Sequence, residues 1–158
     1  MNAKHISRRN FLQSLAGLLL GGAIAALFPQ AARADVPSDL EFFKAVKDPK
    51  APTPIEKEHA IDIRLPIIAE DGANVPIVVS MNHPMAPDHY IKSMQIVNFN
   101  DPVVGKGVYY FTPASGQAFI STQIRMDGGD AEVYVIAECN QHGKWVNSKQ
   151  LKVSLGGC

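Results

Sequence analysis

The chain has 158 residues, of which 46% are apolar and 19% charged, and its 15 basic side chains balance its 15 acidic ones. That length and apolar fraction suit one folded domain and exclude a disordered chain. The lack of a basic excess argues against a nucleic-acid partner. Two cysteines are too few for a disulfide-rich scaffold or a four-thiolate zinc site.

Residues 1–34 are predicted to be a cleaved export signal. Ser7-Arg8-Arg9-Asn10-Phe11-Leu12 resembles the twin-arginine signal that exports folded proteins, and Ala32-Arg33-Ala34 fits cleavage before Asp35. The apolar run between them is too short to span a bilayer comfortably. We therefore expect a bacterial periplasmic protein that is free of the membrane after cleavage. The remaining 11 basic and 15 acidic residues argue further against nucleic acid.

Residues 35–58 are predicted to form a short helix and a proline-rich connector. Ser38-Asp39-Leu40-Glu41 has the pattern of a capping box, and the helix is expected to continue through Val46. Asp48-Pro49 should end it, because the residue before a proline disfavours helical backbone. Three prolines between residues 49 and 54 then predict a stiff connector.

Residues 59–155 alternate between apolar and polar side chains with a period of two, which is typical of strands. Ile61, Ile63, Leu65 and Ile67 are expected to share one face of a first strand, and a second strand follows from Val75 to Met81. The turn-forming residues 70–74 between them predict a hairpin. Five further strands are expected, at 90–99, 107–112, 117–126, 131–139 and 145–155. About seven short strands indicate an all-β fold, an antiparallel immunoglobulin-like sandwich with a short N-terminal helix.

The chain ends in Gly156-Gly157-Cys158 directly after the last strand pattern. Glycine has the greatest backbone freedom, so residues 156–158 are expected to form a flexible arm. A thiol at the tip of such an arm could form a covalent bond with a substrate and present it to separate enzymes. No base is placed beside Cys158 by any recognisable spacing, so the pattern favours a carrier over an enzyme.

Five sequence blocks follow one another along the chain: Val75-Pro76-Ile77, His83-Pro84-Met85-Ala86-Pro87-Asp88-His89-Tyr90-Ile91-Lys92-Ser93, Tyr110-Phe111-Thr112-Pro113-Ala114-Ser115-Gly116, Ser121-Thr122-Gln123-Ile124-Arg125 and Lys152-Val153-Ser154-Leu155-Gly156-Gly157-Cys158. In this order, the blocks resemble the SoxY family of sulfur carriers from bacterial sulfur-compound oxidation. Chains of that family usually end Gly-Gly-Cys-Gly-Gly, whereas this sequence stops at the cysteine.

The resemblance implies that Cys158 attaches thiosulfate-derived sulfur and that Gly156 and Gly157 form the flexible stem. It implies a heterodimer with a SoxZ-like subunit, which lacks an export signal of its own in that family. It also implies transient docking to a c-type cytochrome, a sulfate-releasing hydrolase and a sulfur dehydrogenase. The chain itself is then expected not to be an enzyme. It is expected to bind no metal and no cofactor, and to hold only the sulfur species attached to Cys158.

A function of another class, periplasmic copper binding, is the alternative. Met81, His83, Met85 and His89 lie close in sequence, and thioether and imidazole groups suit copper. Cys139 shares its face of a strand with apolar residues, so we expect it to be buried, although a regulatory disulfide with Cys158 is a second possibility. Three successive aromatic residues at 109–111 place rings on both faces of a strand, and one face is a candidate for contact with a partner.

Overall fold

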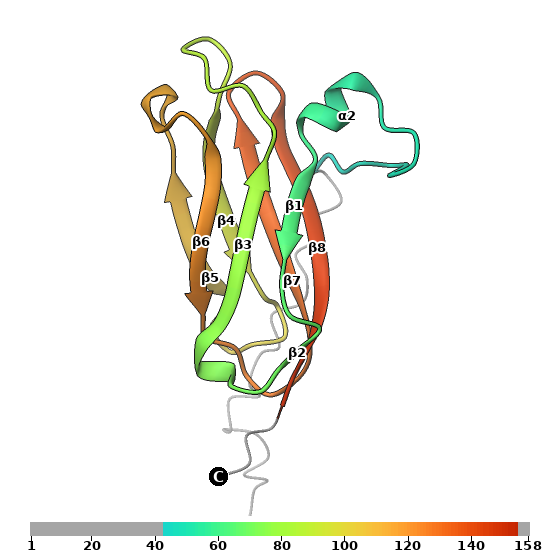
Figure 1. Ribbon diagram of the computed structural model, residues 1–158, viewed down its shortest axis with the longest axis vertical. Coiled ribbons are helices and arrows are strands. Elements are labelled where there is room, and N and C mark those ends of the chain that lie inside the picture. Colours follow the sequence, from blue (N-terminus) through green and yellow to red (C-terminus); the bar gives the residue numbers. More distant parts are fainter. Residues whose placement is uncertain (1–42, 155–158) are drawn as a thin grey trace, which may run out of the picture. The chain divides into compact units, whose positions relative to one another are not determined.

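A computed structural model describes residues 43–154, which form a sandwich of two β-sheets (Figure 1). One sheet has the strand order β1-β3-β6 and the other β2-β8-β7-β4-β5. The strands are β1 (Ile61–Arg64), β2 (Ile68–Ala69), β3 (Val75–Met81), β4 (Ile91–Val97), β5 (Gly105–Tyr110), β6 (Ala118–Ile124), β7 (Gly129–Cys139) and β8 (Gly143–Val153). The predicted all-β fold is confirmed. The predicted export signal (1–34) and the arm (156–158) lie outside the described residues.

The core lies between the two sheets because each strand turns alternate apolar side chains inward. In β7 the inward residues are Val133, Val135, Ala137 and Cys139, all nearly inaccessible to solvent. β7 pairs antiparallel with β8 along its whole length, from Gly129 opposite Val153 to Cys139 opposite Gly143. This long hairpin connects the two ends of the sandwich.

The predicted hairpin of residues 61–81 is only partly correct. β1 and β3 do pair antiparallel, with Ile61 opposite Met81. However, the first strand ends at Arg64, and Ile67 is 83% exposed instead of sharing the core face. Pro66 has no backbone N–H to donate to a neighbouring strand. The chain then crosses to the other sheet, where β2 pairs parallel with the end of β8.

The predicted helix is wrong over residues 43–46, and its expected capping box at 38–41 lies outside the described residues. A short helix is found in the predicted connector. Lys44 forms an isolated parallel bridge to Trp145 of β8, so this segment is extended. The helix α2 (Pro54–Glu58) begins after Thr53, whose side chain forms a capping box with Glu56. Proline at the first helical position lacks only an N–H that would be unpaired there. No helix within residues 43–154 is long and apolar enough to cross a membrane.

Candidate functional site: a histidine–cysteine cluster

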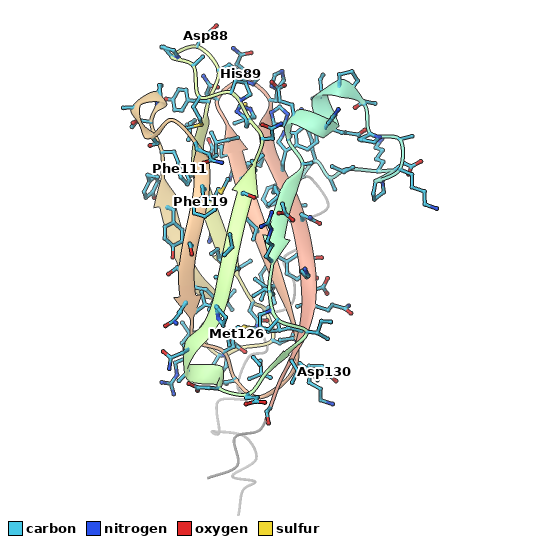
Figure 2. The ribbon with its side chains drawn as sticks, viewed as in Figure 1. Asp88, His89, Phe111, Phe119, Met126 and Asp130 are labelled. Carbon is cyan, nitrogen blue, oxygen red and sulfur yellow. The ribbon has the colours of Figure 1, made fainter. Side chains whose placement is uncertain are left out.

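The end of the sandwich at the β7–β8 turn gathers every histidine among the described residues. We call this group, with one buried cysteine, the His/Cys cluster; its members are His59, His83, His89, Cys139 and His142. Figure 2 shows His89 beside Asp88 at this end, far along the strands from Met126 and Asp130 at the other. Three separate parts of the chain contribute to the cluster.

His59 is held by the short helix and by the sandwich. It is the C-terminal capping residue of α2, and its Nδ1 lies 2.8 Å from the backbone oxygen of Ile55. Its ring stacks on the indole of Trp145, with centroids 4.6 Å apart and planes 21° from parallel. Because both contacts fix the plane of the ring, Nε2 of His59 has a defined direction into the cluster.

His83 and His89 belong to the loop between β3 and β4. Nδ1 of His83 lies 2.6 Å from the backbone oxygen of Pro84. Ala86 and His89 exchange two backbone hydrogen bonds, which close a turn beside them. The Asn140 side chain fastens this loop to the β7–β8 turn: it donates to the backbone oxygen of Asp88 and accepts from the backbone N–H of Tyr90.

Cys139 and His142 come from the β7–β8 hairpin itself. Cys139 is the last residue of β7 and faces inward, as its apolar alternation predicted, with 2% of its surface exposed. His142 lies in the turn, just before Gly143, whose φ of 76° is a left-handed conformation that glycine adopts without strain. The Lys44 ammonium donates to the backbone oxygen of His142.

The ring nitrogens and the sulfur of the cluster face one another. Nε2 of His59 lies 3.2 Å from Nε2 of His83, and Nε2 of His89 lies 3.1 Å from Nδ1 of His142. The sulfur of Cys139 is 3.8 Å from Nδ1 of His142. Burial lowers the pKa of both His59 and His83, which favours neutral rings with free lone pairs. Neutral imidazole and thiolate are ligands of transition metals, so the cluster has the chemistry of a metal site.

The last strand, β8, ends at the opposite end of the sandwich from the His/Cys cluster. β8 ends at Val153, which pairs with Gly129, ten positions before Cys139 on β7. That separation is roughly 33 Å of strand, whereas the five residues 154–158 reach about 17 Å when fully extended. A disulfide between Cys139 and Cys158 of one chain is therefore out of reach. Cys158 itself lies outside the described residues.

The structure brings together only half of the residues of the copper alternative. His83 and His89 do lie side by side, with ring centroids 4.4 Å apart. Met81 is instead buried in the core between the sheets, and Met85 packs against that core. Sequence reasoning missed His59 and His142. The Cys-Asn-Gln-His spacing of residues 139–142, in a turn that follows a buried strand, was the signal that could have found His142.

The family model described as "Sulfur oxidation protein SoxY" matches residues 47–158. The chain belongs to the SoxY family. The match runs through the last strand to the terminal cysteine, and it supports a carrier role in sulfur oxidation within a system that has partner subunits. The chain has no match among curated proteins.

The solved structures of similar fold are superoxide reductases. A single-residue variant of superoxide reductase (neelaredoxin) from Ignicoccus hospitalis matches with a TM-score of 0.63 and 22% identity, covering 74% of this chain and 98% of that chain. The reduced form of the protein from Archaeoglobus fulgidus matches with a TM-score of 0.50 and 17% identity, covering 70% and 98%. At these identities the likeness shows a shared fold. These neighbours are not copper proteins.

Proposed function

We propose that this SoxY-family chain carries thiosulfate-derived sulfur on Cys158 in the periplasm and presents it to separate enzymes. The observation that supports this most directly is the family match, which extends to residue 158 and so includes the Gly156-Gly157-Cys158 arm. The second cysteine, Cys139, is buried, which leaves Cys158 as the thiol available to substrates and enzymes.

Loading forms a sulfur–sulfur bond between the Cys158 thiolate and the outer sulfur of thiosulfate. This oxidation releases two electrons, which a c-type cytochrome accepts. Hydrolysis of the adduct by a second enzyme returns sulfate and leaves sulfane sulfur on Cys158, which a sulfur dehydrogenase then oxidises. The chain supplies the attachment point, and the processing enzymes supply the catalytic groups.

A partner subunit is expected to cover exposed apolar side chains at the open edges of the sheets. β5 and β6 are edge strands, and they expose Val108 and Tyr110 (82%) on β5 and Phe119 on β6. Exposed apolar residues on an edge strand are a ready site for pairing with another chain. The partner is a second sulfur-oxidation subunit, which travels with this chain through the twin-arginine route. Tyr110→Lys should weaken co-purification of that subunit.

Intact mass spectrometry of protein purified from a native periplasm tests the carrier function. We expect sulfur adducts that a reductant removes, present in the Cys139→Ser control and absent after Cys158→Ser. Adducts that persist without Cys158, or their absence from the wild-type protein under thiosulfate oxidation, would overturn the proposal.

A second candidate function, the reduction of superoxide, is favoured by the His/Cys cluster. The solved structures of similar fold are named superoxide reductases. Reduction of superoxide to hydrogen peroxide takes up one electron and two protons. The side chains of the cluster provide no one-electron carrier by themselves, so the function requires a redox-active group bound there. Superoxide removal in pulse radiolysis should be lost in Cys139→Ser and kept in Cys158→Ser; no removal by the metal-loaded wild-type protein excludes this function.

A further inference from the structure

The two most deeply buried histidines of the His/Cys cluster face each other through ring nitrogens that both lack a hydrogen. His59 and His83 are 1% and 7% exposed. In each ring Nδ1 faces a backbone carbonyl oxygen, of Ile55 for His59 and of Pro84 for His83. A carbonyl oxygen only accepts, so Nδ1 must carry the hydrogen and Nε2 must hold a lone pair.

These two Nε2 lone pairs point at one another across 3.2 Å. Two acceptors at that distance form no hydrogen bond, and a buried polar atom without a partner costs about 1–3 kcal/mol. A cation between the rings removes this conflict. Ligating histidines in metal sites commonly donate their other N–H to a carbonyl oxygen in this way.

Four members of the cluster form one compact group of donors, and His83 adjoins that group through its contact with His59. One ligand atom from each of His59, His89, Cys139 and His142 lies within 4.8 Å of all the others. Nitrogen atoms bound to one metal at ~2.0–2.1 Å lie about 2.8–3.4 Å apart at right-angled or tetrahedral positions. The observed separations of 3.2 Å and 3.1 Å between ring nitrogens fall in that range.

We propose that the His/Cys cluster is a mononuclear site for a divalent first-row transition-metal ion, bound by the imidazoles of His59, His83, His89 and His142 and the thiolate of Cys139. The site stands whether or not the chain reduces superoxide or carries sulfur.

The donor set decides the class of metal. Four imidazole nitrogens and one thiolate suit first-row transition ions, whereas calcium and magnesium need oxygen ligands. The only carboxylate that contacts the described cluster is Glu58, 3.9 Å from the outward Nδ1 of His89, where it can orient that ring. Five donors also exceed the four of a structural zinc site. The cluster therefore fits a metal that accepts five ligands, such as iron(II) or cobalt(II).

Metal binding to the full exported chain tests this site. The metal-stripped protein is titrated with Co(II), and separately with Fe(II) without oxygen, and bound metal is measured by elemental analysis after gel filtration. We expect one equivalent per chain and, with Co(II), a thiolate-to-metal charge-transfer absorption. Cys139→Ser should abolish that absorption, and His59→Gln with His83→Gln should lower affinity by at least a hundredfold.

The matched control is Cys158→Ser, which should bind metal as the wild-type protein does. Far-ultraviolet circular dichroism and thermal melting show whether each variant is folded; if Cys139→Ser fails to fold, His142→Gln replaces it on the exposed turn. Binding below half an equivalent in the wild-type protein, an unchanged absorption in Cys139→Ser, or loss of metal in Cys158→Ser would overturn the proposed site. The last result would assign metal to the arm without contradicting sulfur loading.

Discussion

The two ends of the sandwich bury polar groups in opposite ways. At the end where β8 stops, the Asp101 carboxylate is paired with the Lys106 ammonium, and both side chains are buried. Asp101 also accepts from the backbone N–H of Asp127. At the other end, Nε2 of His59 lies 3.2 Å from Nε2 of His83, and the Nδ1 atom of each ring faces a backbone carbonyl oxygen. One end pairs its buried charges within the chain, whereas the other brings buried nitrogen lone pairs together, which is the geometry behind the proposed metal site.

The same division separates the two thiols. Cys139 is buried in the cluster, whereas β8, after which Cys158 comes five residues later in the sequence, ends at Val153 opposite Gly129, at the end that holds the Asp101–Lys106 pair. Because roughly 33 Å of strand lies between these ends, chemistry at one thiol should leave the other unchanged. Separate substitutions should therefore abolish the carrier function without affecting the proposed metal site, and the reverse.

The largest expected effect is that each of two cysteine variants loses one property completely and keeps the property that the other variant loses. Cys158→Ser should lose all sulfur adducts and retain its metal, because the cluster lies at the other end of the strands. Cys139→Ser should lose the thiolate–metal absorption and retain sulfur loading. Adduct mass and bound metal are measured on the same preparations. If either variant loses both properties while folded, the two ends are not independent.

The second largest effect is a loss of stability when the buried Asp101–Lys106 pair is broken. Lys106→Met leaves the Asp101 carboxylate buried without its partner and should lower the free energy of unfolding by about 3–5 kcal/mol. Urea unfolding measures this, and the double variant Asp101→Asn, Lys106→Met should recover part of the loss. Metal affinity of the folded Lys106→Met fraction should not change. A loss below 1 kcal/mol would show that the pair does not determine the stability of this end.

A smaller effect is expected from the loop that carries His83 and His89. Asn140→Ala removes the hydrogen bonds to Asp88 and Tyr90 that fasten this loop to the β7–β8 turn. Metal affinity should fall on the order of tenfold, as for other residues that orient ligands. Competition with a chelator of known affinity measures the change, and Gln141→Ala, which removes one bond to Asp88, is the milder control. Equal affinities in Asn140→Ala and the wild type would contradict the role of this contact.

The smallest effect is expected for the surface pair of Lys92 and Glu138. The hydrogen bond from Lys92 lowers the pKa of the Glu138 carboxyl below its unfolded value of about 4.3. Its stabilisation is therefore present above that pH and is lost as the pH falls through the folded pKa. Glu138→Gln should be slightly less stable than the wild type at pH 7 in low salt, and the difference should shrink as the pH falls below about 4.3 or as salt is added. A difference that grows on acidification would reverse the sign of this argument.

The sequence predicted the parts of the fold that depend on neighbouring residues. Alternation along 131–139 and the turn at 140–143 correctly indicated the β7–β8 hairpin and a buried Cys139. The helix at Pro54–Glu58 was missed because the prolines between residues 49 and 54 were interpreted as a connector, although Thr53 and Glu56 form a capping box there. The extended Lys44 segment was missed because its only strand partner, Trp145, lies about a hundred residues away.

The His/Cys cluster shows the same limit. His83 and His89 are six residues apart and could be grouped from sequence. His59 joins them only because β1 pairs with β3, and His142 only because β4 pairs with β7. No local pattern contains those pairings. The sequence therefore suggested a soft metal set with two methionines, where the folded chain assembles four histidines and a cysteine.

The most direct test of the account is native mass spectrometry of the wild-type protein after loading with both thiosulfate-derived sulfur and Fe(II). We predict a single species that carries a reductant-sensitive sulfur adduct on Cys158 and one metal ion at the same time. Fragmentation should assign all added sulfur to the terminal peptide. Adducts on Cys139, or molecules that carry either sulfur or metal and never both, would contradict it.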